Sequence, residues 1–194
     1  MGRGYNSIDR REKPNYTEEK ERGRCLLLKI GYCRIVSESG HDAAYAALLA
    51  LWQEETDRPF PRIACTERGK PYFVDEKLYF SISHTKHHAF CALSDVPVGI
   101  DAEEMDRVVN PSLAEKILSP GEYAQYLAAR DKNKALLTFW VLKEAEAKCT
   151  GEGLRGYPNK TSFSLDDPRV QEMNGCLGAV IKENDGCFLI HTPT

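Results

Sequence analysis

Residues that could take part in chemistry occur in the stretch Val98–Glu103, which reads Val-Gly-Ile-Asp-Ala-Glu. Side chains alternate between the two faces of an extended strand, so the apolar residues of this stretch face a core. Asp101 and Glu103 then share the opposite face, about 6.5 Å apart at the backbone. Two carboxylates at this spacing can converge on one hard divalent cation of the Mg²⁺ type. An isolated pair is more often a solvated acidic strand face, so a metal site needs support from elsewhere in the chain.

A second set of such residues lies further along the chain, in a segment with helical periodicity. Trp140, Glu144 and Lys148 follow one another at intervals of four residues, with Lys143 beside them. Residues at this spacing share one face of a helix. A Glu–Lys pair on its own would be an ordinary surface ion pair, but the tryptophan on the same stripe indicates that the face is covered. This helix and the acidic strand together favour a chemical role for the carboxylates.

The segments up to the acidic strand predict one helix and several strands. Residues 25–36 read as strand or hairpin, and an apolar stripe after Asp42 predicts a helix that packs on a sheet, with Asp42 as its N-cap. Residues 78–83 and 98–103 alternate between apolar and polar side chains, and the apolar stretch 89–93 lies between them as the return strand of a hairpin. Because short turns join these three stretches, we expect them to form an antiparallel meander.

The segments after the acidic strand predict helices followed by strands. Ser119–Glu122 has the pattern of a capping box, Asp131 is placed to cap the long helix, and Gly151 is placed to end it. Three further strands are predicted at 161–165, 177–182 and 187–191, the last two joined as a hairpin by the turn at 184–186. This order of elements argues for an α+β fold of two packed halves.

Composition limits the domain organisation and the partners. The 194 residues suffice for one large or two small domains, and we expect an N-terminal half at 25–97, a C-terminal half at 98–194 and a charged, flexible tail at 1–24. The net charge of −3 gives no global basic field, so no nucleic-acid partner is expected. No apolar run approaches about 18 residues, so no membrane partner is expected either. The seven scattered cysteines indicate reduced thiols in a cytoplasmic protein.

Taken together, these segments resemble the 4′-phosphopantetheinyl transferases, specifically the longer type that activates nonribosomal peptide and polyketide synthases. The matching residues appear in the family's order: Gly69–Pro71, Phe80–Thr85, Val98–Glu103, Leu118–Tyr123, Phe139–Lys148 and Gly151–Leu154. The set as a whole is far more specific than any one of its members.

The resemblance implies two similar α+β halves related by a pseudo-twofold axis, each a small antiparallel sheet packed on a long helix. Coenzyme A would lie in the cleft between the halves. Asp101, Glu103 and Glu144 would hold Mg²⁺ against its diphosphate, an oxygen-only ligand set that suits this ion. The family type also implies a monomer, because both halves are on one chain.

The reaction implied by the resemblance is the attack of a carrier-protein serine hydroxyl on the β-phosphorus of coenzyme A, with release of 3′,5′-ADP. Glu144 would accept the serine proton, directly or through a water, and Lys148 would neutralise charge on the phosphate oxygens. Lys70, Ser83 and His84, together with Lys148, would contact the phosphates of coenzyme A. The expected partners are coenzyme A and an apo acyl or peptidyl carrier protein.

The region before the first long helix departs from the family pattern, which has a basic cluster there for the 3′-phosphate of coenzyme A. Only Arg34 and His41 are available at the corresponding place. We therefore expect weaker discrimination between coenzyme A and its 3′-dephospho form. Substitutes for the cluster would be His84 or a basic residue near the tail, namely Arg22, Arg24 or Lys29.

Two other functions stay open at the level of the sequence. One is a non-catalytic module that binds coenzyme A or a carrier domain on the same fold, and the thin 3′-phosphate site is its main support. The other is a Mg²⁺-dependent phosphodiesterase, which would need a positioned water nucleophile that no residue pattern supplies.

Overall fold

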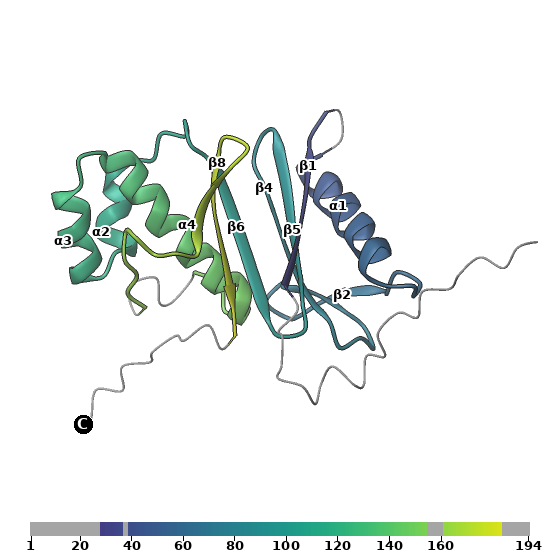
Figure 1. Ribbon diagram of the computed structural model, residues 1–194. Coiled ribbons are helices and arrows are strands. Elements are labelled where there is room, and N and C mark those ends of the chain that lie inside the picture. Colours follow the sequence, from purple (N-terminus) through teal and green to yellow (C-terminus); the bar gives the residue numbers. More distant parts are fainter. Residues whose placement is uncertain (1–27, 37–38, 155–160, 184–194) are drawn as a thin grey trace, which may run out of the picture.

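The structure is a computed structural model that describes residues 28–36, 39–154 and 161–183 (Figure 1). The predicted tail at 1–24 and the predicted strand at 187–191 lie outside the described residues. The fold is α+β, as expected, with antiparallel sheets and helices on their faces. No helix in the described ranges is both long and apolar enough to cross a membrane.

The first sheet has the strand order β1-β5-β4 and is antiparallel throughout. Its strands are β1 (Leu28–Arg34), β4 (Tyr79–His84) and β5 (His88–Ser94). Helix α1 (Gly40–Glu55) packs on β5 and β1, and it buries Leu48 and Trp52 in a core that includes Phe80 and Leu93 (Figure 1). A two-stranded ribbon of β2 (Ile63–Cys65) and β3 (Pro71–Phe73) adjoins this core.

Helix α1 begins earlier than the sequence predicted. Its N-cap is Ser39, whose hydroxyl oxygen accepts a hydrogen bond from the backbone N–H of Asp42 at 3.1 Å. The expectation that Asp42 is the N-cap was therefore wrong by one helical turn. Asp42 instead lies in the first turn, where its carboxylate accepts a hydrogen bond from the Ser39 hydroxyl. The negative charge of Asp42 also interacts favourably with the positive end of the helix dipole.

The second sheet has the strand order β6-β8-β7 and packs on the long helix α4 (Lys132–Thr150). Its strands are β6 (Val98–Glu104), β7 (Val170–Met173) and β8 (Cys176–Lys182). Asn174 and Gly175 join β7 to β8 with φ values of 53° and 79°, as a tight hairpin turn requires. One prediction needs correction here, because 161–165 is not a strand. The predicted strand at 177–182 is found as β8, which pairs with β6 and β7, and its predicted hairpin partner lies outside the described residues.

The two sheets meet along β4 and β6, which lie side by side in Figure 1. They are joined by side chains rather than by a backbone ladder. The hydroxyl oxygens of Ser81 and Ser83 accept hydrogen bonds from the backbone N–H groups of Ile100 at 3.1 Å and Ala102 at 3.2 Å. The predicted three-stranded meander was therefore wrong at its third strand, because β6 starts a new sheet instead of pairing with β5.

The helices of the second half have the ends that the sequence predicted. The short helices η2 (Pro111–Leu113) and α2 (Ala114–Ile117) precede α3 (Pro120–Ala128), which begins with the complete capping box of Ser119 and Glu122. Asp131 caps α4, and Gly151 ends it in a left-handed conformation with φ of 76°.

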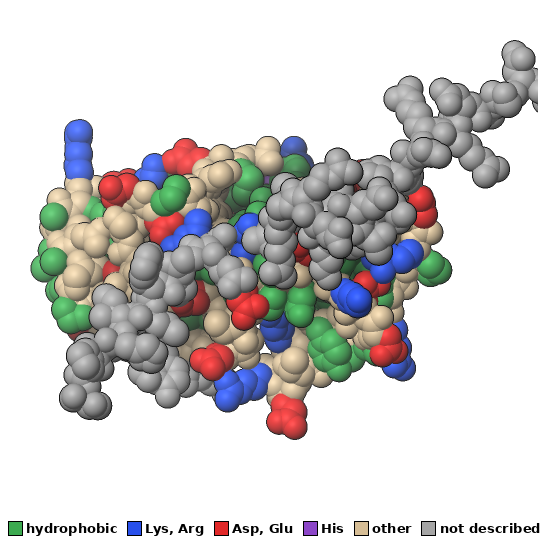
Figure 2. Space-filling model, turned by 60° about the horizontal axis from the view of Figure 1, so that its bottom comes forward, with side chains coloured by type: hydrophobic (Ala, Val, Ile, Leu, Met, Phe, Trp, Pro, Cys, Tyr) green, Lys and Arg blue, Asp and Glu red, His purple; other side chains and the backbone are tan. Residues whose placement is uncertain are grey.

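Acidic and basic side chains are interspersed on the described part of the face in Figure 2, so binding of an anion would depend on a local site.

Candidate functional site

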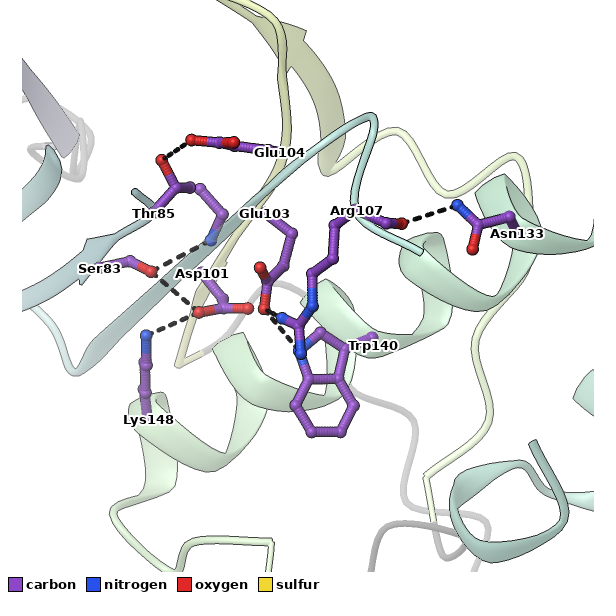
Figure 3. A network of polar contacts seen from close by, with 10 residues as sticks. Ser83, Thr85, Asp101, Glu103, Glu104, Arg107, Asn133, Trp140 and Lys148 are labelled. Carbon is purple, nitrogen blue, oxygen red and sulfur yellow. Dashed lines mark hydrogen bonds and ion pairs between the residues drawn. The ribbon is translucent and has the colours of Figure 1, made fainter. Parts of the chain in front are cut away.

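Asp101 lies at the junction of the two sheets, almost completely buried. Its Oδ1 atom accepts a hydrogen bond from the Ser83 hydroxyl at 2.9 Å and pairs with Lys148 Nζ at 2.7 Å (Figure 3). Its Oδ2 atom is buried and has no hydrogen-bond partner in the described part of the chain. Burial raises the pKa of Asp101 despite the opposing effects of Lys148 and Ser83. A bare, buried carboxylate oxygen is unfavourable unless a cation or donor satisfies it.

Glu103, on the same face of β6, is held from two sides (Figure 3). Its Oε1 atom accepts a hydrogen bond from the Trp140 indole N–H at 3.1 Å and forms an ion pair with Arg107. The Arg107 guanidinium also lies 5.9 Å from the centre of the Trp140 ring. Sequence reasoning missed Arg107. Its spacing from Glu103 suggests a partner only within a helix, and the segment between them forms the end of a strand and a turn.

Glu144 and Lys148 come to this junction from one face of α4. Burial raises the pKa of Glu144, and the neighbouring carboxylates of Asp101 and Glu103 raise it further, against the opposing effects of Lys148 and Arg107. The side chain of Glu144 makes no hydrogen bond to any described residue. Glu144 of α4 and the two carboxylates of β6, remote from it along the chain, therefore share one electrostatic environment.

These carboxylates suit Mg²⁺ in their chemistry, although their present arrangement is not that of an assembled metal centre. The ligand set contains only oxygen atoms, and one of them, Asp101 Oδ2, is buried and unsatisfied. Within the described ranges, however, no three His, Cys, Asp or Glu side chains are grouped as metal ligands. Lys148 and Arg107 instead balance the charges of Asp101 and Glu103. The Mg²⁺ site remains a prediction.

A pocket of about 270 Å³ opens beside Glu144 and Lys148. It brings together the turn between β2 and β3, strand β4 and the end of α4. Lys70, which the sequence singled out, lines it from that turn, and its Nζ atom donates a hydrogen bond to the Cys149 carbonyl at 2.5 Å. Burial lowers the pKa of Lys70. Lys70 thus connects the first half of the chain to the last turn of α4.

The other two residues predicted to contact phosphate do not line this pocket. Ser83 is buried, and its hydroxyl is engaged by Asp101 and Ala102. His84 is exposed, and its ring lies so close to Gly40, at the start of α1, that a Cβ atom on that glycine would lie 2.5 Å from the ring Nδ1. Neither residue is part of the pocket lining, so their contacts with coenzyme A stay predictions.

The part of the chain that contains the carboxylates of the candidate site is similar to a known protein family. Residues 97–185 match the family model of the 4′-phosphopantetheinyl transferase superfamily. The resemblance drawn from the sequence motifs is thereby confirmed. The matched region contains Asp101, Glu103, Glu144 and Lys148, whereas Lys70, Ser83 and His84 precede it.

Three relatives illustrate the similarity. The 4′-phosphopantetheinyl transferase gsp of Aneurinibacillus migulanus is 35% identical over 108 residues, which are 54% of this chain and 44% of the relative. The 4′-phosphopantetheinyl transferase HetI of Nostoc sp. is 35% identical over 45% of this chain and 40% of its own length. A 4′-phosphopantetheinyl transferase of Bacillus subtilis is 33% identical over 52% and 46%. The chain thus spans less than half the length of each of these relatives.

Gly99 explains how the transferase-like strand and helix come close enough to share a site. A Cβ atom at this position would lie 1.9 Å from the Ala145 carbonyl oxygen and 2.4 Å from the Cys149 backbone nitrogen, both in α4. These are rigid backbone atoms, so only glycine lets β6 and α4 approach to this distance. The contact places Glu144 and Lys148 next to Asp101.

Gly99→Ala is expected to lower the free energy of unfolding by about 1–3 kcal/mol or more and to separate α4 from β6. The variant should also lose any activity of the site, because Glu144 and Lys148 move away from Asp101. Urea unfolding measures the loss. The matched control is Gly121→Ala, where nothing lies within 4 Å of the added Cβ atom, and it should be neutral or slightly stabilising. Equal stability of the two variants would contradict the close-approach argument.

Lys143 points away from the candidate site, although it adjoins Glu144 in sequence. Its Nζ atom pairs with Glu122 Oε2 at 2.9 Å and donates to the Thr161 carbonyl at 2.9 Å. The side chains of Lys143 and Glu122 are 2% and 0% exposed, respectively. The structure assigns Lys143 to a buried ion pair that ties α4 to α3 and to the segment at 161–163.

Proposed function

We propose that this protein transfers the 4′-phosphopantetheine group of coenzyme A to a serine of an apo acyl or peptidyl carrier protein, releasing 3′,5′-ADP. The observation that carries the proposal is the junction of β6 and α4. There, within the region that matches the transferase superfamily, Asp101, Glu103, Glu144 and Lys148 lie together beside a pocket. The relatives named above are transferases of this kind. A cytoplasmic monomer is part of the same proposal.

The proposal extends to the symmetry of the fold. Each half of the chain, 25–97 and 98–194, contributes a three-stranded antiparallel sheet with one long helix packed on it, α1 in the first and α4 in the second. The sheets meet edge to edge through β4 and β6. We take the two units to be related by a pseudo-twofold axis, with coenzyme A bound where they meet.

Asp101, Glu103 and Glu144 would hold Mg²⁺ in this scheme, through carboxylate oxygens that include the bare Oδ2 atom of Asp101. The ion would supply positive charge to the diphosphate of coenzyme A and stabilise the charge that develops there. Ser83 keeps Asp101 in place by its hydrogen bond to Oδ1, and Trp140 does the same for Glu103. Arg107 and Trp140 both contact the Oε1 atom of Glu103, so Oε2 would be the oxygen offered to the ion.

In the proposed reaction, one residue of this chain would accept the serine proton and another would neutralise the charge on the leaving group. The serine oxygen bonds to the β-phosphorus, and the bond from this phosphorus to the bridging oxygen of the diphosphate breaks. Glu144, beside Asp101 at the pocket wall, accepts the serine proton directly or through a water. Lys148 lines the pocket and can donate to the oxygens of the departing 3′,5′-ADP.

The decisive experiment is incubation of the protein with coenzyme A, Mg²⁺ and an apo carrier protein, followed by intact mass spectrometry of the carrier. We expect the carrier to gain the mass of one phosphopantetheine group, and to gain nothing when its acceptor serine is replaced by alanine. A panel of acyl and peptidyl carrier proteins covers the unknown partner. No adduct on any carrier would contradict the proposal.

Mg²⁺ dependence is a separate prediction. Removing divalent cations with a chelator should abolish the adduct, and adding Mg²⁺ in excess should restore it. The reason is that Asp101, Glu103 and Glu144 place three carboxylates at one junction, where their negative charge repels a diphosphate unless a metal ion binds between them. The readout is the fraction of modified carrier against free Mg²⁺. Full activity in the presence of the chelator would contradict the metal assignment but not the transfer itself.

A second candidate function is a module that binds coenzyme A or a carrier protein without catalysis. One observation favours it: Lys148 and Arg107 already neutralise Asp101 and Glu103, and the described residues show no assembled metal centre. Binding of coenzyme A without any carrier adduct would support this alternative.

A further inference from the structure

One cation in the pocket is not used by the proposed chemistry. Arg68 lines the pocket from the turn between β2 and β3, next to Gly69 and Lys70. It is exposed, and it forms no ion pair with any acidic residue in the described ranges. Arg107, Arg58 and Arg169, in contrast, each pair with a carboxylate. A guanidinium without a carboxylate partner at a pocket wall is available to bind an anionic ligand.

The turn that presents Arg68 is fixed by several hydrogen bonds. The Thr66 backbone N–H donates to the Lys70 carbonyl at 2.9 Å, and the Gly69 N–H donates to the Thr66 carbonyl at 2.9 Å. The Thr66 hydroxyl oxygen also accepts from the Lys70 N–H at 3.1 Å. Gly69 completes the turn with φ of 85°, which a glycine adopts without strain. Because Lys70 is in turn bound to the end of α4, the turn that bears Arg68 is held next to the helix that bears Lys148.

The charged residues of the pocket indicate what kind of ligand group would bind near Arg68. Arg68, Lys70 and Lys148 line the pocket, and Glu144 is the one acidic side chain among the described residues of its lining. Apolar residues, among them Phe80, Ile82 and Ala147, complete the wall. Lys148 lies at the carboxylate junction, whereas Arg68 lies on the β2–β3 turn. Such a pocket suits a ligand with two separate anionic groups joined by a less polar body.

Coenzyme A has two arms that extend from its diphosphate, and only one of them carries a second anionic group. The pantetheine arm is uncharged, whereas the adenosine arm bears a 3′-phosphate. The pocket volume of about 270 Å³ is at the lower end for small-molecule sites, so it holds one arm rather than the whole molecule. With the diphosphate next to Lys148, the additional guanidinium favours the charged arm.

We infer that Arg68 binds the 3′-phosphate of coenzyme A and is the residue that distinguishes coenzyme A from its 3′-dephospho form. The inference rests on the proposed function, because it takes coenzyme A as the ligand. It also changes the expectation drawn from the sequence, where the thin basic region before α1 predicted weak discrimination. Arg68 supplies the missing positive charge from a different part of the chain.

The test is a two-by-two comparison of two proteins with two ligands. The dissociation constants of coenzyme A and 3′-dephospho-coenzyme A are measured by calorimetry with the wild type and with Arg68→Ala, in Mg²⁺ and without a carrier protein, so that no turnover occurs. We expect the wild type to bind coenzyme A about tenfold or more tightly than the dephospho form. In Arg68→Ala this preference should fall to about twofold or less, because only coenzyme A loses a contact.

Two further variants complete the design. Arg62→Ala removes the same charge from the residue just before β2, which is exposed and does not line the pocket, and it should keep the full preference. Arg68→Lys should keep part of the preference for coenzyme A. The positive charge remains, but an ammonium group cannot make the paired hydrogen bonds that a guanidinium makes to a phosphate. Thermal unfolding of all variants should be unchanged.

The outcomes separate the inference from the proposed function. Coenzyme A binding with a preference that survives in Arg68→Ala overturns the role of Arg68 and leaves the proposed function standing. A wild type without preference also overturns it and supports the weak discrimination expected from the sequence. Failure of every protein to bind either ligand overturns the proposed function and, with it, the inference.

Discussion

Replacing Glu144 by Gln is expected to lower phosphopantetheine transfer by at least about 100-fold. The amide cannot accept the serine proton, and it removes one of the three negative charges proposed to hold Mg²⁺. Glu144 is placed for the role of base because it lines the pocket next to Lys148 and shares the electrostatic environment of Asp101. The measurement is the initial rate at which the carrier protein gains a phosphopantetheine group.

The fold should not suffer from this change. A carboxyl group with a raised pKa in the folded state stabilises the protein below its ordinary pKa near 4.5, and this contribution is lost as the pH rises through the raised value. At pH 7 without metal, the ionised Glu144 is therefore unfavourable in the folded state. Glu144→Gln should be at least as stable as the wild type there, with a smaller advantage as the pH falls toward 4.5.

Glu146→Gln is the matched control for this loss. Glu146 lies two residues further along α4, on a different face of the helix, where its charge acts on Lys143. The control should transfer phosphopantetheine at close to the wild-type rate. If Glu144→Gln keeps more than about a tenth of the wild-type rate, Glu144 is not the base.

Lys143→Met is expected to lower the free energy of unfolding by about 3–5 kcal/mol, the largest loss of stability predicted for a single change in this chain. The change leaves Glu122 charged and buried without its cation. Two backbone donors remain to the carboxylate, Ser119 N–H at 2.7 Å and Phe163 N–H at 2.9 Å, but they carry no full charge. Burial also lowers the pKa of Lys143, opposed by Glu122, which shows how much the pair depends on its partner. Urea unfolding gives the measurement.

The same substitution at Lys134 provides the control. Lys134, also on α4, pairs with Glu172 at 2.5 Å, but both side chains are about half exposed. Exposed pairs contribute about 0–1 kcal/mol, so Lys134→Met should have little effect. Adding Glu122→Gln to Lys143→Met should recover part of the stability, because it removes the uncompensated charge. Similar losses for Lys143→Met and Lys134→Met would show that the buried pair has no special weight.

Local patterns determined the ends of the helices and the faces of the acidic strand. The capping box at Ser119, the cap at Asp131 and the left-handed Gly151 all depend on side chains within one turn of the backbone groups that they satisfy. The alternation of Val98–Glu103 likewise sends the apolar side chains into the core and Asp101 and Glu103 toward the site. Such features were readable from the sequence because their partners are only a few residues away.

The tertiary structure alone decided which strands pair and which charges meet. Alternation shows that β6 is a strand but not which edge it joins, and hydrogen bonds from its backbone to Ser81 and Ser83 place it beside β4. The approach of β6 to α4 at Gly99, the pairing of Lys143 with Glu122, and the positions of Arg68 and Arg107 follow from packing between distant segments. The residues of the candidate site were thus visible in the sequence, while their neighbours were not, because electrostatic contacts depend on distance in space rather than along the chain.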